Sequence, residues 1–416
     1  MKDNDTERAA RIRGYKARHG TKGNGNDDEP AAELEVRTVP LDFDPTKLEP
    51  RGWLLGNTIC IGFVSVLLAA GAVGKTAMLI LEALSLATGR SLTGAHVFRR
   101  VKVLIVSLED DGTEFLRRLA AAVIHYGISN EDLHGWLHFA TPADLGLKLA
   151  TIVDGTFTVG DLGPALKEKI DTLSVEAVCL DPFIKTHGVG ENANESIDQV
   201  MTILTKLAQD RACGFRLAHH TTKGPPDPGN ADRGRGASSG VDAARLVHTL
   251  NPMSTEDAKI FNAKRGEQRF LIRRDDAKVN LTPKAEDATW FKLVGVELGN
   301  TKVRPEYPAG DTVQTAERWT PPDLWNGLSY AVLNMILDDL DAGLADGARF
   351  SDDNAAKTRA AWQVAFRHLG ENEEQCKEII RVWVKTGQLT KREYEDKKRG
   401  EKVWGLYVNP DKRPGQ

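Results

Sequence analysis

Residues 63–89 read FVSVLLAAGAVGKTAMLILEALSLATG, and this stretch decides the fold class. Its first part, Phe63 to Ala69, is apolar apart from one serine, which predicts a buried β-strand. The run from Lys75 to Thr88 has apolar residues on more than one side and is followed by a glycine, so it predicts a buried helix. A loop of small residues joins the two. This order of strand, loop and helix predicts a site that binds phosphate groups at the start of the helix.

The loop follows the pattern G-x-x-x-x-G-K-[ST], except that Ala69 stands where the pattern has its first glycine. Small residues allow backbone N–H groups to surround phosphates, and the helix N-terminus attracts anions. We expect Lys75 to reach the β- and γ-phosphates of ATP and Thr76 to hold Mg²⁺. The residues expected to contact the nucleotide are Ala70, Gly71, Ala72, Val73, Gly74, Lys75, Thr76 and Ala77.

Two other predicted strands end in carboxylates. VEAVCLD ends at Asp181, which is placed to hold the magnesium ion; an Asp that caps a turn before proline is the alternative. VKVLIVSLE ends at Glu109 and is followed by Asp110 and Asp111. A general base must lie close to the attacking water, and we favour Glu109 because it lies nearest the strand. Asp110 or Asp111 suits the N-cap of the next helix.

The strand CGFRLA ends in a polar cluster, His219 to Lys223. Ligands of α/β proteins bind at the carboxyl ends of strands, so one of these groups is a candidate sensor of the γ-phosphate. Zinc binding is not favoured, because no third ligand lies nearby in the sequence. Arg216 inside this strand either lies at an edge of the sheet or pairs with an acid.

The composition is that of a globular chain with two or three domains, since 416 residues include 41% hydrophobic and 27% charged residues. A formal net charge of -4 excludes a polyanion-binding composition over the whole chain but not local basic patches. The four cysteines are scattered, which favours a reducing compartment. The N-terminus lacks an apolar signal region, and the most apolar stretch is too short to span a bilayer. We therefore expect a cytoplasmic protein without a membrane partner.

Apolar strands alternate with helices through the middle of the chain, which predicts an α/β domain with a mostly parallel sheet covered on both faces. Antiparallel strands are expected to extend this sheet beyond about residue 235. The N-terminal tail has few apolar residues and mixed charge, which predicts disorder; a basic arm that touches nucleic acid is the alternative. The expected divisions are a tail over 1–45, the α/β domain over 46–300, a Pro-rich linker over 301–323, a small α+β domain over 324–409 and a tail over 410–416.

Six segments in order resemble the RepA-type hexameric replicative helicases of plasmids, which are RecA-like ATPases, and a wider set of RecA-like or AAA-family ATPases of plasmids and prophages. The segments are AAGAVGKT, LEDDGTEFLRRL, LDPFIKTHGVGENANESIDQV, AHHTTKG, RGASSGVDAARLVHTL and FLIRRDDAKVN. The resemblance covers about residues 53–293 and implies a RecA-like P-loop core that hydrolyses ATP. Compact plasmid helicases of this type lack the N-terminal tail and the carboxyl extension.

The resemblance also assigns roles. Lys75 and Thr76 match the phosphate loop, Glu109 the catalytic glutamate, Asp181 the Walker B aspartate and His220 the histidine that senses the γ-phosphate. Arg245 matches the arginine finger given to a neighbouring subunit, and Arg273 is a second finger candidate. Single-stranded DNA would be held by two loops in the ring; the residues expected there are His187 and Asn194 in one loop and Lys223, Arg233 and Arg235 in the other.

The carboxyl extension predicts three helices, over 325–343, 354–370 and from 372 onward, followed by a hairpin over 395–408 with a basic tip. This order resembles a winged helix that binds DNA; a module that contacts protein is the alternative. The basic residues at the tip are Lys397, Lys398 and Arg399.

Together these features predict an ATP-dependent motor on single-stranded DNA, a plasmid or prophage replicative helicase, with a hexameric ring favoured over a filament. Replication or regulatory proteins are expected partners. The alternatives are a DNA-tethered regulatory or defence ATPase that does not unwind DNA and a recombinase-like filament former.

Overall fold

The computed structural model describes residues 36–141, 146–190, 193–221, 226–233, 238–261, 263–285, 287–302, 304, 306–321, 328–370, 372–396 and 400–415. These residues form two compact units. The first comprises the described residues up to Asn251 together with Ile272–Trp319, and the second comprises Pro252–Leu271 together with the described residues from Thr320 onward.

The first unit is built on a nine-stranded sheet. Five neighbouring pairs, from β10 across to β5, are parallel, which confirms the predicted mostly parallel α/β core. Every residue of β3, β4 and β8 is buried, because helices cover both faces of these central strands. In spatial order the strands are β13 (Thr312–Arg318), β12 (Thr289–Glu297), β11 (Leu271–Val279), β10 (Leu246–Pro252), β3 (Val64–Ala69), β9 (Gly214–His220), β8 (Ala177–Asp181), β4 (Val103–Ser107) and β5 (Leu137–Ala140).

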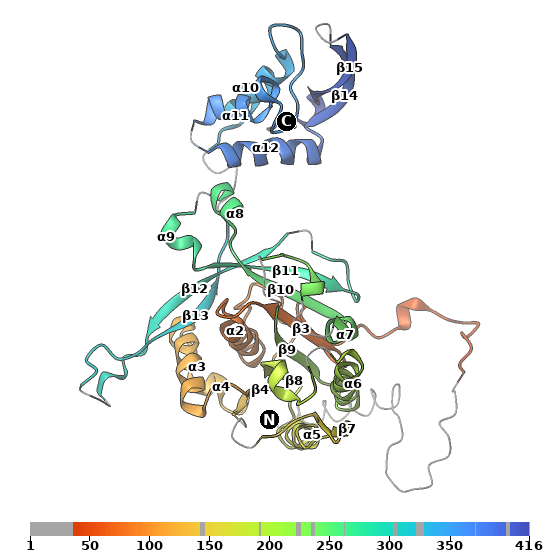
Figure 1. Cartoon of the computed structure of the whole chain (residues 1–416), viewed down its shortest axis with the longest axis vertical. Coiled ribbons are helices and arrows are strands. Elements are labelled where there is room, and N and C mark those ends of the chain that lie inside the picture. The colour runs from red at the N-terminus through yellow and green to blue at the C-terminus, as the bar shows by residue number, and fades with distance from the viewer. Residues whose placement is uncertain are drawn as a thin grey trace. The chain divides into compact units, whose positions relative to one another are not determined.

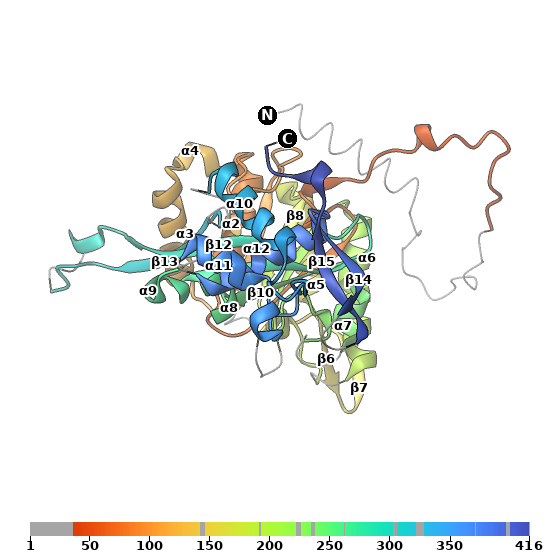
Figure 2. The same ribbon diagram turned by 90° about the horizontal axis from the view of Figure 1, so that it is seen from above.

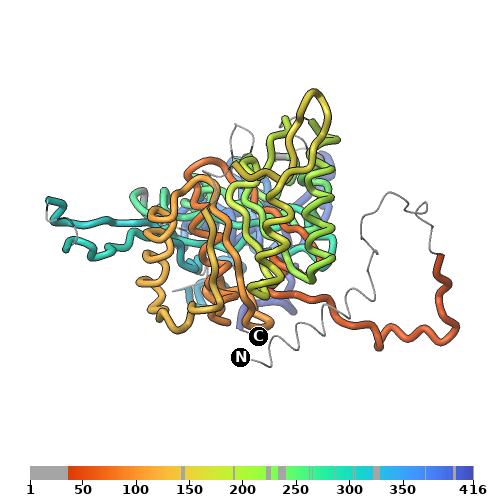
Figure 3. Tube along the Cα trace, turned by 90° about the horizontal axis from the view of Figure 1, so that it is seen from below, coloured from red at the N-terminus to blue at the C-terminus, as the bar shows by residue number. Residues whose placement is uncertain are grey.

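Helices lie on both faces of the parallel strands (Figure 1). One face carries α2 (Lys75–Thr88), α3 (Gly112–Tyr126) and α4 (Asn130–Leu133), and the other carries α5 (Leu162–Leu173), α6 (Asn194–Asp210) and α7 (Ser238–Ala243). Figure 3 shows the orange and the yellow-green segments on opposite sides of the sheet. Leu204 of α6 and Leu180 of β8 belong to the core on the second face. Helix α2 is buried along most of its length, because strands, α3 and α4 surround it.

Two small hairpins accompany the main sheet. Strands β1 (Trp53–Leu55) and β2 (Ile59–Cys60) pair antiparallel, as do β6 (Ala150–Val153) and β7 (Thr156–Val159). The β6–β7 hairpin extends outward in Figure 2. Our sequence analysis did not predict it, although its turn is an Asp-Gly pair, Asp154 and Gly155, with positive φ angles of 49° and 78°. Asp-Gly between short strands is a strong hairpin signal, and it would have identified this element.

Strand β13 corrects the linker expected over 301–323. Its seven residues pair antiparallel with β12, from Phe291 beside Arg318 to Glu297 beside Thr312. The prolines that suggested a linker lie before and after this strand, so they leave its N–H groups available for pairing. The β12–β13 ribbon extends away from the rest of the unit in Figure 1 and Figure 2.

The second unit contains three helices and a two-stranded hairpin around its own core. Its elements are α10 (Tyr330–Ala342), α11 (Trp362–Leu369), α12 (Glu373–Thr386), β14 (Leu389–Asp396) and β15 (Glu401–Val408). The second helix is shorter than predicted, because Lys357 has a positive φ of 49° within the short 3-10 helix η6 (Lys357–Arg359). The order of elements agrees with the helices and hairpin that we predicted for this region.

An insertion in the nine-stranded sheet also belongs to the second unit. The segment between β10 and β11 forms α8 (Thr255–Ile260) and α9 (Arg265–Gln268), and α8 contacts α12. The Asn372 side chain donates a hydrogen bond to the Lys259 carbonyl oxygen. The domain boundary expected at residue 300 therefore differs from the structure, in which 252–271 leaves the first unit and residues up to 319 stay in it.

Across the described ranges of the chain, we find no helix with both the length and the apolar character needed to cross a membrane.

Candidate nucleotide-binding site

The phosphate loop lies between the carboxyl end of β3 and the start of α2. Ala72 and Gly74 have positive φ angles of 62° and 94°. A side chain at Gly74 would also collide with Leu293 of β12, because its Cβ would lie 2.8 Å from Leu293 Cδ2. The positive φ therefore favours glycine at position 74, and a Cβ there would also have to displace the end of the Leu293 side chain.

Lys75 follows directly and is almost buried, with 7% of its surface exposed. Its Nζ lies 3.0 Å from His220 Nδ1 and donates to the Ala70 carbonyl oxygen at 3.2 Å. Burial lowers the pKa of the Lys75 ammonium, while the carboxylates of Asp181 and Glu109 act in the opposite direction. An ammonium group can only donate, so Nδ1 of His220 accepts, and the proton of the neutral imidazole sits on Nε2.

Asp181 and Thr76 form the expected magnesium position. The Thr76 hydroxyl donates to Asp181 Oδ2 at 2.6 Å. Burial raises the pKa of the Asp181 carboxyl group, and the hydrogen bond from Thr76 and the charge of Lys75 lower it. A hydroxyl and a carboxylate are oxygen donors of the kind that Mg²⁺ prefers. No group of three or more His, Cys, Asp or Glu within the described residues could hold a metal, so the remaining ligands would be phosphate oxygens and water.

The three acidic residues that follow β4, Glu109, Asp110 and Asp111, make different contacts. Asp111 caps α3, since its side chain accepts from the Glu114 N–H at 2.8 Å. Asp110 pairs with Arg118 at 2.8 Å. Glu109 is exposed and makes no hydrogen bond or ion pair with the described part of the chain. Of the three, Glu109 is therefore the carboxylate still available to a water molecule.

The candidate site residues lie close together because the carboxyl ends of parallel strands lie at the same edge of the sheet. β3, β4, β8 and β9 are parallel neighbours, with Ser107 beside Asp181 and Ala69 beside His220. Their carboxyl ends therefore bring the phosphate loop, Glu109, Asp181 and His220 to the same edge of the sheet. The arrangement can bind a nucleoside triphosphate, hold Mg²⁺ and present a carboxylate to water.

The two arginine candidates lie just before β10 and on β11. β10 runs parallel to β3, with Leu246 beside Ser65 and Leu250 beside Ala69. Arg245 precedes Leu246, so this exposed residue lies at the amino ends of the strands, about 16 Å of strand away from the phosphate loop. Arg273 lies on β11 and pairs with Asp275 at 2.6 Å.

The residues expected to touch DNA are only partly described. Asn194 is exposed at the start of α6, and Arg233 ends the short helix η4 (Ala231–Arg233). Lys223, Arg235, Lys397, Lys398 and Arg399 lie outside the described residues. His187 differs from the expectation of an exposed loop residue, because it is buried with 4% of its surface exposed.

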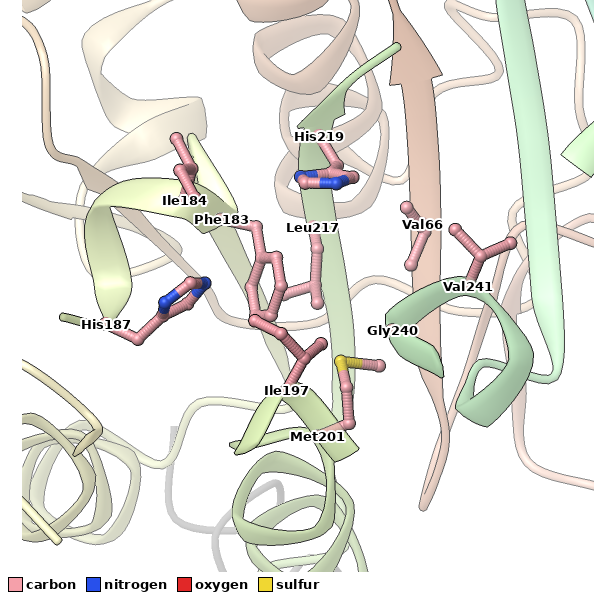
Figure 4. A pocket seen from close by; sticks show the side chains of 10 residues that line it. All are labelled: Val66, Phe183, Ile184, His187, Ile197, Met201, Leu217, His219, Gly240 and Val241. Carbon is pink, nitrogen blue, oxygen red and sulfur yellow. The ribbon is translucent and has the colours of Figure 1, made fainter. Parts of the chain in front are cut away.

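His187 instead lines a small, mostly apolar cavity (Figure 4). Figure 4 shows Phe183 of η3 (Phe183–Thr186) between His187 and His219, and its ring centroid lies 4.9 Å and 5.5 Å from theirs. Among the described residues, neither ring nitrogen of His187 makes a hydrogen bond of good geometry, and the backbone of Val189 is the polar group that acts on the imidazole. Burial lowers the pKa of His187 to about 4. Sequence reasoning missed this cluster, although Phe and His after a buried strand were visible.

The comparisons with known proteins agree with this site. Residues 30–226 match the family model of the AAA domain. The match includes Lys75, Glu109, Asp181 and His220, whereas Arg245 lies beyond it. No curated protein matches the chain. Residues 30–226 are therefore similar to an AAA domain, and the phosphate loop within them has the geometry expected of a P-loop ATPase.

Proposed function

We propose that the protein is an ATP-driven motor on single-stranded DNA, a replicative helicase of the RepA-like type that assembles as a hexameric ring. The observation that carries the proposal is the position of Arg245. It is exposed at the amino ends of the strands, whereas its own phosphate loop lies at their carboxyl ends. An arginine so placed supports a role in a neighbouring subunit's site, as in the family that the motifs resemble.

The site supports hydrolysis by a simple division of tasks. Backbone N–H groups of the loop and Lys75 would hold the phosphates, and Thr76 and Asp181 would hold Mg²⁺. The metal ion neutralises negative charge on the phosphates when it is bound. Glu109 orients a water molecule and takes its proton. Arg245 of a neighbouring subunit stabilises the charge that develops on the γ-phosphate.

His220 is the sensor in this scheme. Because its Nδ1 accepts from Lys75, the proton of the neutral ring lies on Nε2, and this N–H is the group that would donate to a γ-phosphate oxygen. When the phosphate leaves, Lys75 returns to His220 and to the loop carbonyls. The chain after His220 leads directly into one of the two expected DNA loops, so nucleotide state and DNA grip would be coupled.

The second unit would serve as a DNA tether, with the hairpin tip as its contact. Three helices followed by a hairpin support a winged-helix reading. The backbone at Phe350 lies beside the hairpin, since Leu406 N–H donates to the Phe350 carbonyl oxygen at 2.8 Å. A regulatory or defence ATPase that does not unwind DNA remains the alternative class.

The first test measures ATP hydrolysis with and without single-stranded DNA, together with strand displacement on a forked duplex. The motor predicts DNA-stimulated hydrolysis and displacement. If single-stranded DNA does not change the rate of ATP hydrolysis and no strand displacement occurs, the result would instead favour the regulatory ATPase.

The second test mixes two inactive variants. Arg245→Ala keeps the phosphate loop, and Lys75→Ala keeps the arginine. In mixed assemblies some interfaces contain an intact loop and an intact arginine, so partial activity returns if Arg245 acts in trans. If the Arg245→Ala protein hydrolyses ATP as fast as the wild type, then Arg245 is not an arginine finger.

A further inference from the structure

A fully buried ion pair joins helix α2 to the strand that carries the sensor histidine. Glu82 of α2 and Arg216 of β9 both have 0% of their surface exposed. Arg216 Nε donates to Glu82 Oε2 at 2.9 Å, and its second terminal nitrogen donates to Oε1 at 3.0 Å. β9 is an interior strand between β3 and β8, so the acid partner, not an edge position, accounts for this arginine.

The ion pair and the Lys75–His220 contact connect the same two elements. Lys75 and Glu82 are seven residues apart on α2, nearly two turns, so they lie on one face about 10 Å apart along the axis. Arg216 and His220 are four residues apart on β9, on one face and about 13 Å apart. The contacts at 3.0 Å and 2.9 Å are therefore two successive ties between α2 and β9.

Neighbouring charges balance the pair. Arg274 of β11 lies 3.8 Å from Glu82 and donates to the Thr58 hydroxyl at 3.3 Å. Asp276 of the same strand accepts from Asn57 at 2.7 Å. The cluster thus contains two arginines and two acids.

One neutral histidine completes the cluster. His248 of β10 places Nδ1 3.2 Å from an Arg216 nitrogen. Burial and the nearby arginines keep the pKa of His248 well below its usual range, so it stays neutral.

A buried ion pair of this kind adds little net stability, because taking both charges out of water offsets their attraction. The effect of the ion pair is instead geometric, because it fixes the position of the helix relative to the strand. Apolar side chains allow a helix to shift along a sheet at small cost, whereas two parallel N–H···O bonds define both distance and orientation. A bidentate pair two turns below Lys75 therefore limits how far α2 can slide or rotate on β9.

We propose that Glu82 and Arg216 are positioning residues that set the axial position of α2 on β9, and with it the placement of Lys75 relative to His220. The inference rests on the proposed ATPase function and deepens it, since it names what holds the phosphate lysine and the sensor in register. Neither side chain touches the nucleotide.

The main test replaces both residues, as Glu82→Leu with Arg216→Met. The double change removes one charge of each sign and leaves Arg274 and Asp276 balanced. Exchanging a buried ion pair for apolar residues is often neutral for stability, so the melting temperature should change by only a few degrees. We expect kcat for ATP to fall at least tenfold, since misplacement by about 1 Å can cost a hundredfold, while KM changes less than threefold.

A matched control uses another bidentate pair in this unit. Arg99 and Glu176 bond at 2.8 Å, and Glu176 directly precedes β8, at the amino ends of the strands. Arg99→Met with Glu176→Leu should leave kcat within twofold of the wild type. Glu82→Asp, which keeps the charge but shortens the side chain, should show an intermediate loss and remains informative if the double variant folds poorly.

A binding measurement keeps the inference independent of turnover. Fluorescently labelled ATPγS and ADP report how strongly the site distinguishes the γ-phosphate. We expect the ratio of the affinity for ATPγS to the affinity for ADP to fall at least threefold in the Glu82/Arg216 variant. The same ratio should stay unchanged in the Arg99/Glu176 control. Wild-type protein that binds nucleotide without hydrolysis would overturn the proposed function alone. Unchanged kcat or an unchanged affinity ratio in the folded double variant would overturn the positioning role.

Discussion

The phosphate site and helix α12 both carry basic residues, but the basic residues of the two regions have different kinds of partner. Lys75 touches only neutral groups, two backbone carbonyls and a neutral imidazole. On α12, Lys377 pairs with Glu373 at 2.6 Å, and Arg381 pairs with Glu378 one turn away. A buried cation that makes no ion pair with an acid among the described residues is placed to bind an anion, whereas a cation paired on its own helix is not. The difference separates a ligand site from a solvated helix surface.

Replacing each lysine tests the comparison most strongly. Lys75→Met should lower ATP hydrolysis by at least a hundredfold, because the charge that faces the phosphates is lost. Lys377→Met should leave hydrolysis within twofold of the wild type, since its ion pairs are exposed and weak. Steady-state hydrolysis of both purified variants checks this, and equal losses would mean that the two environments do not differ as described.

The carboxylates provide the next contrast. Asp181→Asn should reduce hydrolysis about a hundredfold and raise the Mg²⁺ concentration needed for half-maximal rate, because the buried carboxylate beside Thr76 is lost. Asp110→Asn removes an acid that pairs with Arg118 and should cost much less. A magnesium titration of both variants measures the effect; an unchanged titration in Asp181→Asn would exclude Asp181 from the metal site.

The histidines extend the comparison to stability. His187 has a pKa near 6.5 when unfolded and about 4 in the folded protein, so the unfolded chain takes up the proton first as the pH falls. Its contribution is complete above pH 6.5 and is lost as the pH falls toward 4. We expect the free energy of unfolding to fall by up to about 2 kcal/mol between pH 7 and pH 5 through this residue.

His187→Leu should remove that share of the pH dependence, although His248 keeps part of it. Urea unfolding at pH 7 and pH 5 provides the measurement. His368, which pairs with Asp339 at 2.8 Å on the second unit, offers a control as His368→Gln. If the pH dependence of His187→Leu equals that of the wild type, then the buried imidazole is not the source.

The smallest effect is expected on α12 itself. Arg381→Gln should change affinity for single-stranded DNA less than twofold, because its charge is already matched by Glu378. Replacing Lys397, Lys398 and Arg399 by Ala should reduce the salt dependence of binding by a slope of up to about 3. Affinity for single-stranded DNA, measured over a range of salt concentrations, distinguishes the two variants. If Arg381→Gln weakens binding more than the replacement of the three hairpin residues does, then α12 and not the hairpin tip would be the DNA contact of the second unit.

The phosphate site was predictable because each of its residues ends a local pattern. Glu109, Asp181 and His220 follow apolar strands, and parallel strands bring their ends to one edge. The position of Arg245 was not predictable in the same way. Its distance from the phosphate loop depends on the order and direction of β10 and β3, which a local pattern does not encode.

The remaining differences have the same origin. β13 was hidden by flanking prolines, and its strand character comes from pairing with β12. His187 sits in a polar stretch of sequence, yet Phe183 and apolar residues from α6 and β9 bury it. In both cases contacts with distant parts of the chain override local composition.

The amino-acid sequence alone was sufficient to define the class of fold, the phosphate loop and the acids around it, because backbone conformation and burial along a strand are local properties. The partner of Arg216 was not, since Glu82 lies 134 residues away and is one of many acids in the chain. Which acid meets which arginine depends on how far a helix extends along a sheet and in which order the strands lie. Those distances exist only after the chain has packed, and only then does a buried charge acquire a partner and a role.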